Sequence, residues 1–332
     1  MVLLDSAGRI EWSNLTAANH LGFDPQRDLG QYVRNMVRNP AFTAYLAGGE
    51  FNHEIQIDGI GPRPSQPSKI SLQIHPYGKK RKLMITRDVT AVQLAETMRR
   101  DFVANVSHEI RTPLTVLSGF VETMQSIPLE EADRTRYLSL MSQQAHRMQT
   151  LVSDLLTLSR LEGSPAPGPG EWIDGEELLT HVVQEARGLT QAISTTQHRI
   201  EPVPGPAIWV SGAKTELLSA MSNLLSNAVR YTPGGGLIET GWRLRSDGWV
   251  EFFVKDTGPG IAAEHLPRLT ERFYRVDRSR SRETGGTGLG LAIVKHVAQR
   301  HGGHIDADST VGEGSRFAIA LPPNRVRERV TG

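Results

Sequence analysis

Apolar residues recur at spacings of three and four between residues 103 and 155, and this pattern constrains the fold more than any other feature of the chain. Such spacing is typical of amphipathic helices in a coiled-coil-like bundle. A first run passes through Val103, Val106, Ile110, Leu114, Leu117, Val121 and Met124, and a second through Leu138, Met141, Ala145, Met148, Val152 and Leu155. Pro128 separates the two runs. Two helices joined there form a hairpin whose apolar seam is too large for one partner to cover. We therefore expect a twofold dimer with a four-helix bundle.

The first of these helices carries a histidine, a glutamate and a threonine within the sequence NVSHEIRTPL, residues 105–114. At roughly 100° per residue, His108 points about 200° away from the apolar seam. Thr112 lies one turn further along the same face, and Glu109 flanks the histidine. Pro113 cannot donate to the carbonyl four residues back and predicts a bend just after the histidine. Taken alone, an exposed His beside a Glu is more often a solvated helix face than a catalytic site.

Composition sets the broad class of the protein. The 332 residues suffice for two or three domains, and a hydrophobic fraction of 38% with a formal net charge of +1 gives no indication of nucleic-acid binding. The lack of cysteine excludes a disulfide framework and a cysteine nucleophile, and it fits a reducing compartment. No stretch approaches the roughly 20 apolar residues of a membrane span, and the first residues lack the pattern of a signal peptide. The chain as given is expected to be soluble.

The pattern changes twice along the chain, which predicts a multi-domain α+β protein with domains at 1–90, 91–163 and 164–332. The first domain is expected to be a small α+β domain with a short helix at 15–23. Its strands are expected at the two ends of 2–14 and at 51–57, 69–77 and 82–90. The second domain is the helical hairpin. Residues 162–172 are rich in Pro and Gly, cannot propagate helix or sheet, and are interpreted as a hinge.

The third domain is expected to be an α/β sandwich, with one sheet under one layer of helices. Helices are predicted at 175–189, 215–231 and 291–302, and strands at 207–210, 237–245, 249–256, 304–309 and 316–322.

Two asparagines stand at i and i+4 of the predicted helix 215–231. Asparagine is a poor residue for a helix interior, so Asn223 and Asn227 indicate a role beyond helix formation. Two amide oxygens one turn apart suit a hard cation such as Mg²⁺ that is shared with phosphates. A polar strip without a ligand is the alternative for this pair taken alone.

Asp256 closes the predicted strand 249–256 and is followed by the sequence TGPGI. A carboxylate at a strand end can accept a hydrogen bond from an exocyclic amine such as that of adenine. Gly258 and Gly260 let a flat base lie against the backbone. An ordinary Asp-Gly turn explains the same residues if they are taken alone.

A glycine-rich sequence, GGTGLGL at 285–291, leads directly into a predicted helix. Its backbone amides and the positive helix end would form a phosphate cradle. No strand precedes it, as a dinucleotide fold requires, and no Gly-Lys-Ser/Thr ends it, as a P-loop requires. The motif set of Ser/Thr kinases is missing too.

An arginine-rich stretch, RFYRVDRSRSRET, lies between these motifs. Its arginines are Arg272, Arg275, Arg278, Arg280 and Arg282. A basic run is usually a solvated surface, or occasionally a nucleic-acid patch. Because it adjoins a glycine cradle and carries Phe273 and Tyr274, we interpret it as a mobile lid that closes over a polyphosphate.

The order of these motifs resembles that of sensor histidine kinases: a His box, an Asn box, a first Gly box, a lid with a Phe, and a second Gly box. Residues 102–124, 272–297 and 309–322 are similar to the phosphate-regulon members of that family. The resemblance implies that the third domain has the ATP-binding fold shared with gyrase, Hsp90 and MutL. The first domain ends in RDVT, as PAS domains commonly do, which makes it resemble a PAS sensor domain.

The resemblance also implies roles for individual residues. His108 would be the phosphoacceptor, Glu109 would accept its proton, and Thr112 resembles the residue with which such kinases dephosphorylate their own response regulator. ATP and Mg²⁺ would be the cofactors, with Asn227 as the metal ligand and Asn223 on the phosphate side. Asp256 would read adenine and Tyr231 would pack on the base. The other implied nucleotide-binding residues are Arg230, Gly258, Gly260, Phe273, Arg278, Gly286, Thr287, Gly288, Leu289 and Gly290.

As partners, the resemblance implies a second copy of the chain, the receiver domain of a PhoB-like response regulator, and a phosphate-signalling accessory protein of the PhoU type. Full-length relatives begin with membrane helices that anchor them in the inner membrane. The chain is thus expected to be either a truncated cytoplasmic portion or a soluble variant. Two alternatives remain open from the residues: an ATPase clamp of the gyrase or Hsp90 type, and a non-catalytic scaffold.

Overall fold

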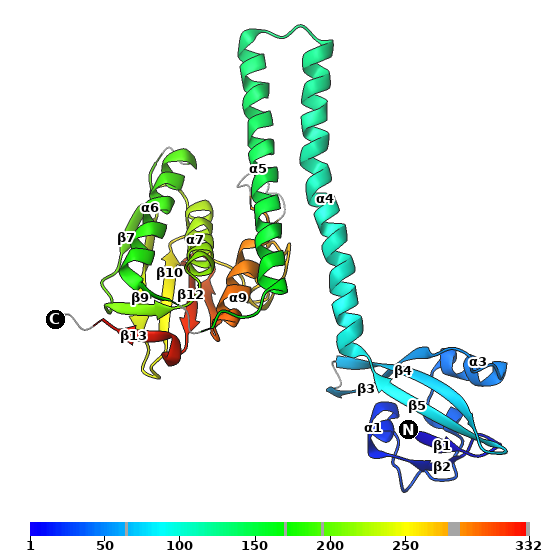
Figure 1. Cartoon of the computed structure of the whole chain (residues 1–332). Coiled ribbons are helices and arrows are strands. Elements are labelled where there is room, and N and C mark those ends of the chain that lie inside the picture. Colours follow the sequence, from blue (N-terminus) through cyan, green and yellow to red (C-terminus); the bar gives the residue numbers. More distant parts are fainter. Residues whose placement is uncertain (64–65, 169–170, 194–195, 278–285, 330–332) are drawn as a thin grey trace. The chain divides into compact units, whose positions relative to one another are not determined.

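The computed structural model describes residues 1–63, 66–168, 171–193, 196–277 and 286–329. The chain divides into two compact units, Met1–Ala104 and Asn105–Gly332, which are described separately below. Figure 1 labels many of the helices and strands in the two units. Within the described ranges, no helix combines the length and the apolar character needed to cross a bilayer.

The N-terminal unit is built on a five-stranded antiparallel sheet in the order β2-β1-β5-β4-β3. Its strands are β1 (Val2–Leu4), β2 (Ile10–Ser13), β3 (Ile55–Arg63), β4 (Gln66–Tyr77) and β5 (Arg81–Asp88). The helices α1 (Leu15–Leu21), α2 (Val33–Met36) and α3 (Pro40–Gly48) all lie between β2 and β3 in the chain. Val2, Leu4 and Met84 from the strands form one core with Ala17 and Phe42 from the helices.

The predicted strands of this unit are confirmed, but β3 covers Ile55–Arg63 rather than 51–57, and β4 begins at Gln66 rather than at residue 69. The helices α2 and α3 were missed by the sequence analysis. In α3 the missed signal is in the caps, because the side chain of Asn39 accepts from Ala41 N, Pro40 is the first helical residue, and Gly49 ends the helix in the left-handed region.

Two long helices follow, α4 (Thr90–Ser126) and α5 (Glu131–Gly163). The prediction of a break at Pro128 is confirmed. Pro113 lies inside α4, which continues past it to Ser126, and it is the buried residue of that helix. The predicted seam is open to solvent in a single chain: Val103 is 57% exposed, Leu114 52% and Leu138 49%. Such a stripe requires a partner, as the expected dimer would provide.

A second apolar stripe on α5 was missed by the sequence analysis, because its residues fall between those of the first. Leu151, Leu158 and Leu161 are the buried residues of this helix. They bring α5 against α9 (Gly290–Arg300). The helix α5 therefore has two apolar faces, one for the expected partner chain and one for the third predicted domain.

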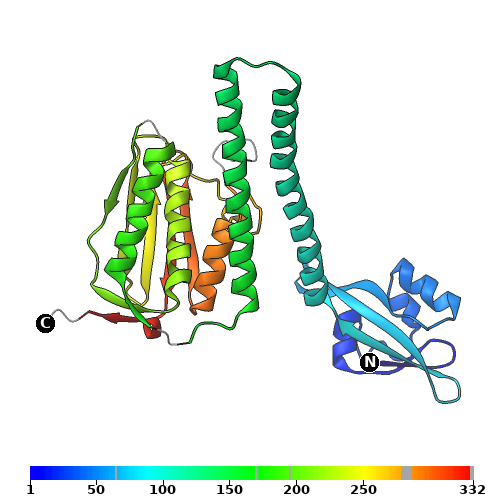
Figure 2. The same ribbon diagram turned by 45° about the horizontal axis from the view of Figure 1, so that its top comes forward.

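That third domain contains a five-stranded sheet in the order β11-β12-β10-β9-β7. The strands are β7 (Arg199–Pro202), β9 (Leu237–Leu244), β10 (Val250–Asp256), β11 (His304–Thr310) and β12 (Gly314–Leu321), and only β7 and β9 pair in parallel. The helices α6 (Gly175–Ile193), α7 (Lys214–Tyr231) and α9 cover one face of this sheet (Figure 2). Trp242, Phe252, Val254 and Ile319 are buried beneath them.

The expectation of a single sheet is wrong. The predicted strand at 207–210 belongs to a separate three-stranded sheet in the order β13-β8-β6. Its strands are β6 (Trp172–Asp174), β8 (Ile208–Ser211) and β13 (Val326–Glu328). Two short 3-10 helices, η1 (Leu266–Arg268) and η2 (Pro323–Arg325), complete the described elements. The predicted hinge is also too long, since Glu162 and Gly163 belong to α5 and Trp172 begins β6.

Gly314 is predicted to be intolerant of a side chain. Its φ is +128°, and a Cβ there would lie 1.9 Å from the carbonyl oxygen of Asp256. Gly312 is the matched control, because its φ is +87° but a Cβ would meet nothing within 4 Å. Gly314→Ala should lower the free energy of unfolding by about 2 kcal/mol more than Gly312→Ala, since overlap adds to the backbone strain that both share. Urea unfolding of the two variants measures this difference, and equal losses would contradict it.

Candidate active site

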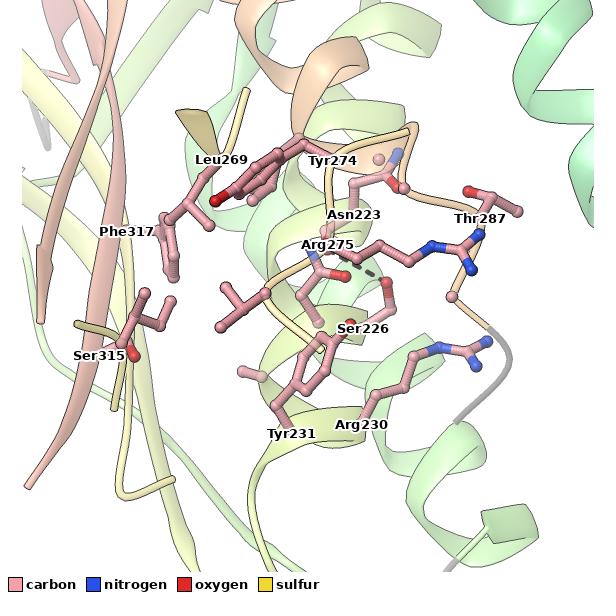
Figure 3. A pocket seen from close by; sticks show the side chains of 18 of the residues that line it. Asn223, Ser226, Arg230, Tyr231, Leu269, Tyr274, Arg275, Thr287, Ser315 and Phe317 are labelled. Atoms are coloured by element: carbon pink, nitrogen blue, oxygen red, sulfur yellow. Dashed lines mark hydrogen bonds between the residues drawn. The ribbon is translucent and has the colours of Figure 1, made fainter. Parts of the chain in front are cut away.

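A cavity of about 300 Å³ lies beside α7, the end of β10 and the start of α9 (Figure 3). It gathers most of the residues that the sequence predicted for nucleotide binding. Those that line it are Asn223, Asn227, Arg230, Tyr231, Asp256, Gly260, Gly286, Thr287, Gly288 and Gly290. Residues that are distant in the sequence therefore meet at one site.

The asparagine pair lies on the face of α7 that borders the cavity. The side-chain amide of Asn223 donates to the carbonyl oxygen of Ser219 at 2.8 Å. Its oxygen Oδ1 faces the start of α9, where a Cβ on Gly290 would lie only 2.5 Å away. Glycine at position 290 thus lets the amide oxygen approach the end of α9, where the free backbone amides of the helix favour anions.

Asp256 ends β10 and is almost fully buried. Burial raises the pKa of this carboxyl group, while the backbone amides of Gly258 and Ser315 oppose the rise by stabilising the carboxylate. The Gly258 amide donates to Asp256 Oδ1 at 2.8 Å. Gly260 has φ +70°, and a Cβ there would lie 2.0 Å from the carbonyl oxygen of Thr310. The end of β10 therefore places the Asp256 carboxylate at the cavity as a hydrogen-bond acceptor. The absence of a side chain at Gly260 lets the following turn lie against the backbone of Thr310.

The remaining wall is apolar and was missed by the sequence analysis. Leu269 and Phe317 line the cavity together with Tyr231 and Tyr274 (Figure 3), and Ile261 lines it as well. Ile261, Leu269 and Phe317 come from separate loops and a strand, so no local spacing marks them. Apolar and aromatic side chains beside the buried carboxylate of Asp256 suit a flat heterocycle that carries an amino group.

Tyr274 is held from outside the cavity. Its hydroxyl lies 2.8 Å from Nδ1 of His265, and the guanidinium of Arg268 lies 4.3 Å from the centre of its ring. These contacts fix the first part of the predicted lid. Arg278, Arg280 and Arg282 lie outside the described residues.

Of the described residues predicted to bind nucleotide, Gly258, Phe273 and Leu289 are not among those that line the cavity. The Phe273 amide donates to the carbonyl oxygen of Gly288 at 2.8 Å, which joins the lid segment to the second Gly box. Both residues have a positive φ, +62° for Phe273 and +74° for Gly288. Leu289 is fully buried immediately before α9. We therefore interpret Phe273 and Leu289 as supports of the glycine-rich loop.

The helix α5 also contributes to the cavity through Thr150 and Asp154, which were missed because they belong to a different predicted domain. The Thr287 hydroxyl donates to Asp154 Oδ2 at 2.7 Å. Burial raises the pKa of Asp154, and this hydrogen bond and the positive charge of Arg230 oppose the rise. The Asp154 carboxylate thus lies beside Thr287 and Arg230, both of which are predicted from the sequence to bind nucleotide.

His108, Glu109 and Thr112 lie outside the cavity lining, on α4. His108 and Thr112 are exposed, and the Thr112 hydroxyl donates to the His108 carbonyl oxygen at 3.1 Å. Glu109 Oε2 accepts from Arg275 at 2.9 Å and from Arg147 at 3.3 Å. Because Arg275 also lines the cavity, it connects the cavity to the residue next to His108.

Two protein families match separate parts of the chain. The HisKA family, described as His Kinase A (phospho-acceptor) domain, matches residues 98–164. The HATPase_c family, described as Histidine kinase-, DNA gyrase B-, and HSP90-like ATPase, matches residues 212–325. This combination defines an ATP-dependent histidine kinase, and the phosphoacceptor match separates the chain from gyrase-like and Hsp90-like clamps.

Comparison with individual relatives shows to which group of histidine kinases the chain is most similar among those compared. The chain is 44% identical over 331 residues to the phosphate regulon sensor protein PhoR of Pseudomonas aeruginosa, an alignment that spans 99% of this chain and 73% of that protein. It is 30% identical over 322 residues to PhoR of Haemophilus influenzae, across 97% of this chain and 73% of that protein. The chain belongs to the PhoR-like sensor histidine kinases.

A solved structure supports the fold. The histidine kinase ThkA in complex with response regulator protein TrrA superimposes with a TM-score of 0.53 and 20% identity, over 97% of this chain and 95% of that chain.

Asp154 is predicted to cost stability at neutral pH. A carboxyl group whose pKa is raised in the folded state costs nothing below its unfolded pKa, near 3.8. Its cost grows as the pH rises from that value to the folded-state pKa and is constant above it. Asp154→Asn keeps an acceptor for Thr287 and removes the charge. The variant should therefore have a higher free energy of unfolding than wild type at pH 7, with a difference that shrinks toward pH 4.

Urea unfolding between pH 8 and pH 4 measures the trend, because the difference changes only between the unfolded and the folded pKa. The exposed carboxylate variant Glu122→Gln on α4 serves as the control. A difference for Asp154→Asn that stays constant with pH, or that matches the control, would refute the assignment.

Proposed function

We propose that this histidine kinase binds Mg-ATP in the cavity and transfers the γ-phosphoryl group to His108. The observation that carries this proposal is the contact of Arg275 with Glu109, because it joins the cavity wall to the neighbour of the histidine. The family matches supply the class of reaction, and the contacts below support the role of each residue.

The cavity residues fit the parts of a nucleotide. Asp256 accepts from the exocyclic amine of adenine, and Tyr231 packs on the base beside the apolar wall. The backbone of Gly286, Gly288 and Gly290 at the start of α9 receives the phosphates. Arg230 opposes their charge.

The amide oxygens of Asn223 and Asn227 fit a hard cation that completes its shell with phosphate oxygens, and Asn227 would be the direct ligand. When bound, Mg²⁺ would neutralise charge on the transferring phosphoryl group.

His108 performs the chemical step with the lone pair of its neutral imidazole. A nitrogen–phosphorus bond forms as the bond between the γ-phosphorus and its bridging oxygen breaks, and ADP leaves with that electron pair. Glu109 accepts the proton from the other ring nitrogen. Arg275 and Arg147 orient the Glu109 carboxylate for this task, since each holds it through Oε2.

The phosphoryl group then passes to an aspartate of a response regulator that docks on the exposed face around His108. By likeness to the PhoR relatives, we propose that this regulator is PhoB-like, that the signal is phosphate starvation, and that a PhoU-like protein takes part. ATP and the regulator are cytoplasmic reactants, so we place the reaction on that side of the membrane.

We also propose the three-domain division at 1–90, 91–163 and 164–332, with the first as a PAS sensor domain. The sheet order 2-1-5-4-3, with α1, α2 and α3 between β2 and β3, supports the PAS assignment. The exposed seam supports a dimeric four-helix bundle.

His108→Ala should abolish self-labelling by γ-labelled ATP, while nucleotide affinity stays within about twofold of wild type, because His108 does not line the cavity. Asn227→Ala is the complementary control and should lose Mg²⁺-dependent ATP binding. Filter binding and acid–alkali stability of the label provide the readouts. Label that persists in His108→Ala, or that survives acid but not alkali, would contradict the assignment.

Thr112 is predicted to hold a water against the phosphorylated aspartate of the docked regulator. Thr112→Ala should keep self-labelling and phosphotransfer but slow the decay of the phosphorylated regulator, measured with ADP-bound kinase, by at least about tenfold. Thr115→Ala is a matched control, since its hydroxyl makes the same kind of bond, to the Arg111 carbonyl oxygen at 3.0 Å. Equal decay rates for Thr112→Ala and wild type would rule out the positioning role.

A further inference from the structure

Arg300, the last residue of α9, uses its whole guanidinium group in hydrogen bonds. Nε and Nη2 donate to the two carboxylate oxygens of Glu216 on α7, at 3.0 Å and 2.9 Å. Nη1 donates to the carbonyl oxygens of Leu161 at 2.8 Å and Ser164 at 2.6 Å, and Nη2 donates to that of Pro165 at 2.9 Å. All five N–H donors of the side chain are engaged, and the side chain is only 11% exposed.

The groups that Arg300 holds belong to two different parts of the chain. Glu216 is part of the ATP-binding domain, whereas Leu161 is in the last turn of α5 and Ser164 and Pro165 begin the segment that follows it. Carbonyls at a helix C-terminus have no partner within the helix, so a cation there is favourable. Arg300 therefore joins the end of the phosphoacceptor hairpin to the ATP-binding domain.

Arg325 extends the attachment. Its Nη1 donates to the carbonyl oxygen of Gly168 at 2.6 Å and its Nη2 to that of Pro167 at 2.7 Å. Four backbone carbonyls between residues 164 and 168 are thus bound by two arginines of the ATP-binding domain. The segment that the sequence predicts as a hinge is therefore bound to this domain between residues 164 and 168.

This attachment lies at the opposite end of α9 from the nucleotide cavity. The helix has 11 residues, about 16 Å at 1.5 Å per residue. Gly290 at its start lines the cavity, where Thr287 bonds Asp154 of α5, and Arg300 at its end bonds Leu161. The helix α9 therefore runs beside α5 with the arginine contact at one end and the cavity at the other.

We propose that Arg300 is a positioning residue for autophosphorylation, acting as the pivot about which the ATP-binding domain turns toward His108. The inference rests on the proposed function of His108. Among the described residues, Thr287–Asp154 and Arg275–Glu109 join the ATP-binding domain to the hairpin at the cavity end. At the other end, Arg300 and Arg325 together donate to five backbone carbonyls, so the cavity end opens first while the Arg300 end stays attached. The pivot keeps the bound nucleotide at a high effective concentration near the histidine.

Arg300→Lys and Arg300→Ala test the pivot. A lysine ammonium has three donors and no planar fork, so it cannot serve Glu216 and three carbonyls together. Both variants should lower the maximal rate of His108 labelling by at least fivefold, while the ATP concentration for half-maximal rate and the rate of phosphotransfer from prephosphorylated kinase stay within twofold. A general loss of structure would change all three quantities.

The absence of cysteine from these 332 residues allows a rescue experiment on this chain. Ser164→Cys/Arg300→Cys should label slowly, and joining the two thiols with a short bismaleimide should restore the rate toward wild type, because a covalent bridge replaces the tether. The same reagent on each single-cysteine variant should restore nothing.

Labelling of Arg300→Ala at or above the wild-type rate would overturn the pivot, and so would a bridge that forms and leaves the rate low. These outcomes are distinct from failure of the proposed function, in which the wild-type chain itself would carry no label on His108.

Discussion

The packing of α5 on α9 is the contact on which the functional arrangement of residues 105–329 depends. Leu151, Leu158 and Leu161 remove one face of α5 from water, and at roughly 1.5–3 kcal/mol per buried leucine this apolar contact is substantial. Hydrogen bonds along the same face of α5 then fix the rotation and the register of α5 against α9. Because of this contact, a cavity built from the ATP-binding domain also has a wall from the phosphoacceptor hairpin.

The sequence predicts the elements well where periodicity or a strand end marks them. The seam from Val103 to Leu155, the asparagine pair on α7 and the carboxylate at the end of β10 are local patterns, so residue spacing alone is enough to predict their elements. The small sheet could not be predicted, because β6 and β13 are three residues long and exist only through their pairing with β8.

The same distinction applies to the site. Asp154, Ile261 and Phe317 come from three distant segments. No local sequence pattern around any of them predicts that the three side chains line one cavity. The polar half of the cavity carries motifs with fixed spacing and was predicted. The apolar half and the α5 wall arise from tertiary packing, in which shape and burial matter more than residue type.

The open seam of the hairpin has a consequence for how the protein responds to its own abundance. Since Leu114 and Leu138 find no cover within one chain, part of the stability of the hairpin comes from association and therefore follows mass action. Diluting the chain shifts the population toward monomers with a wetted apolar stripe. The fraction of assembled chain is then a function of its concentration, separate from any effect of nucleotide.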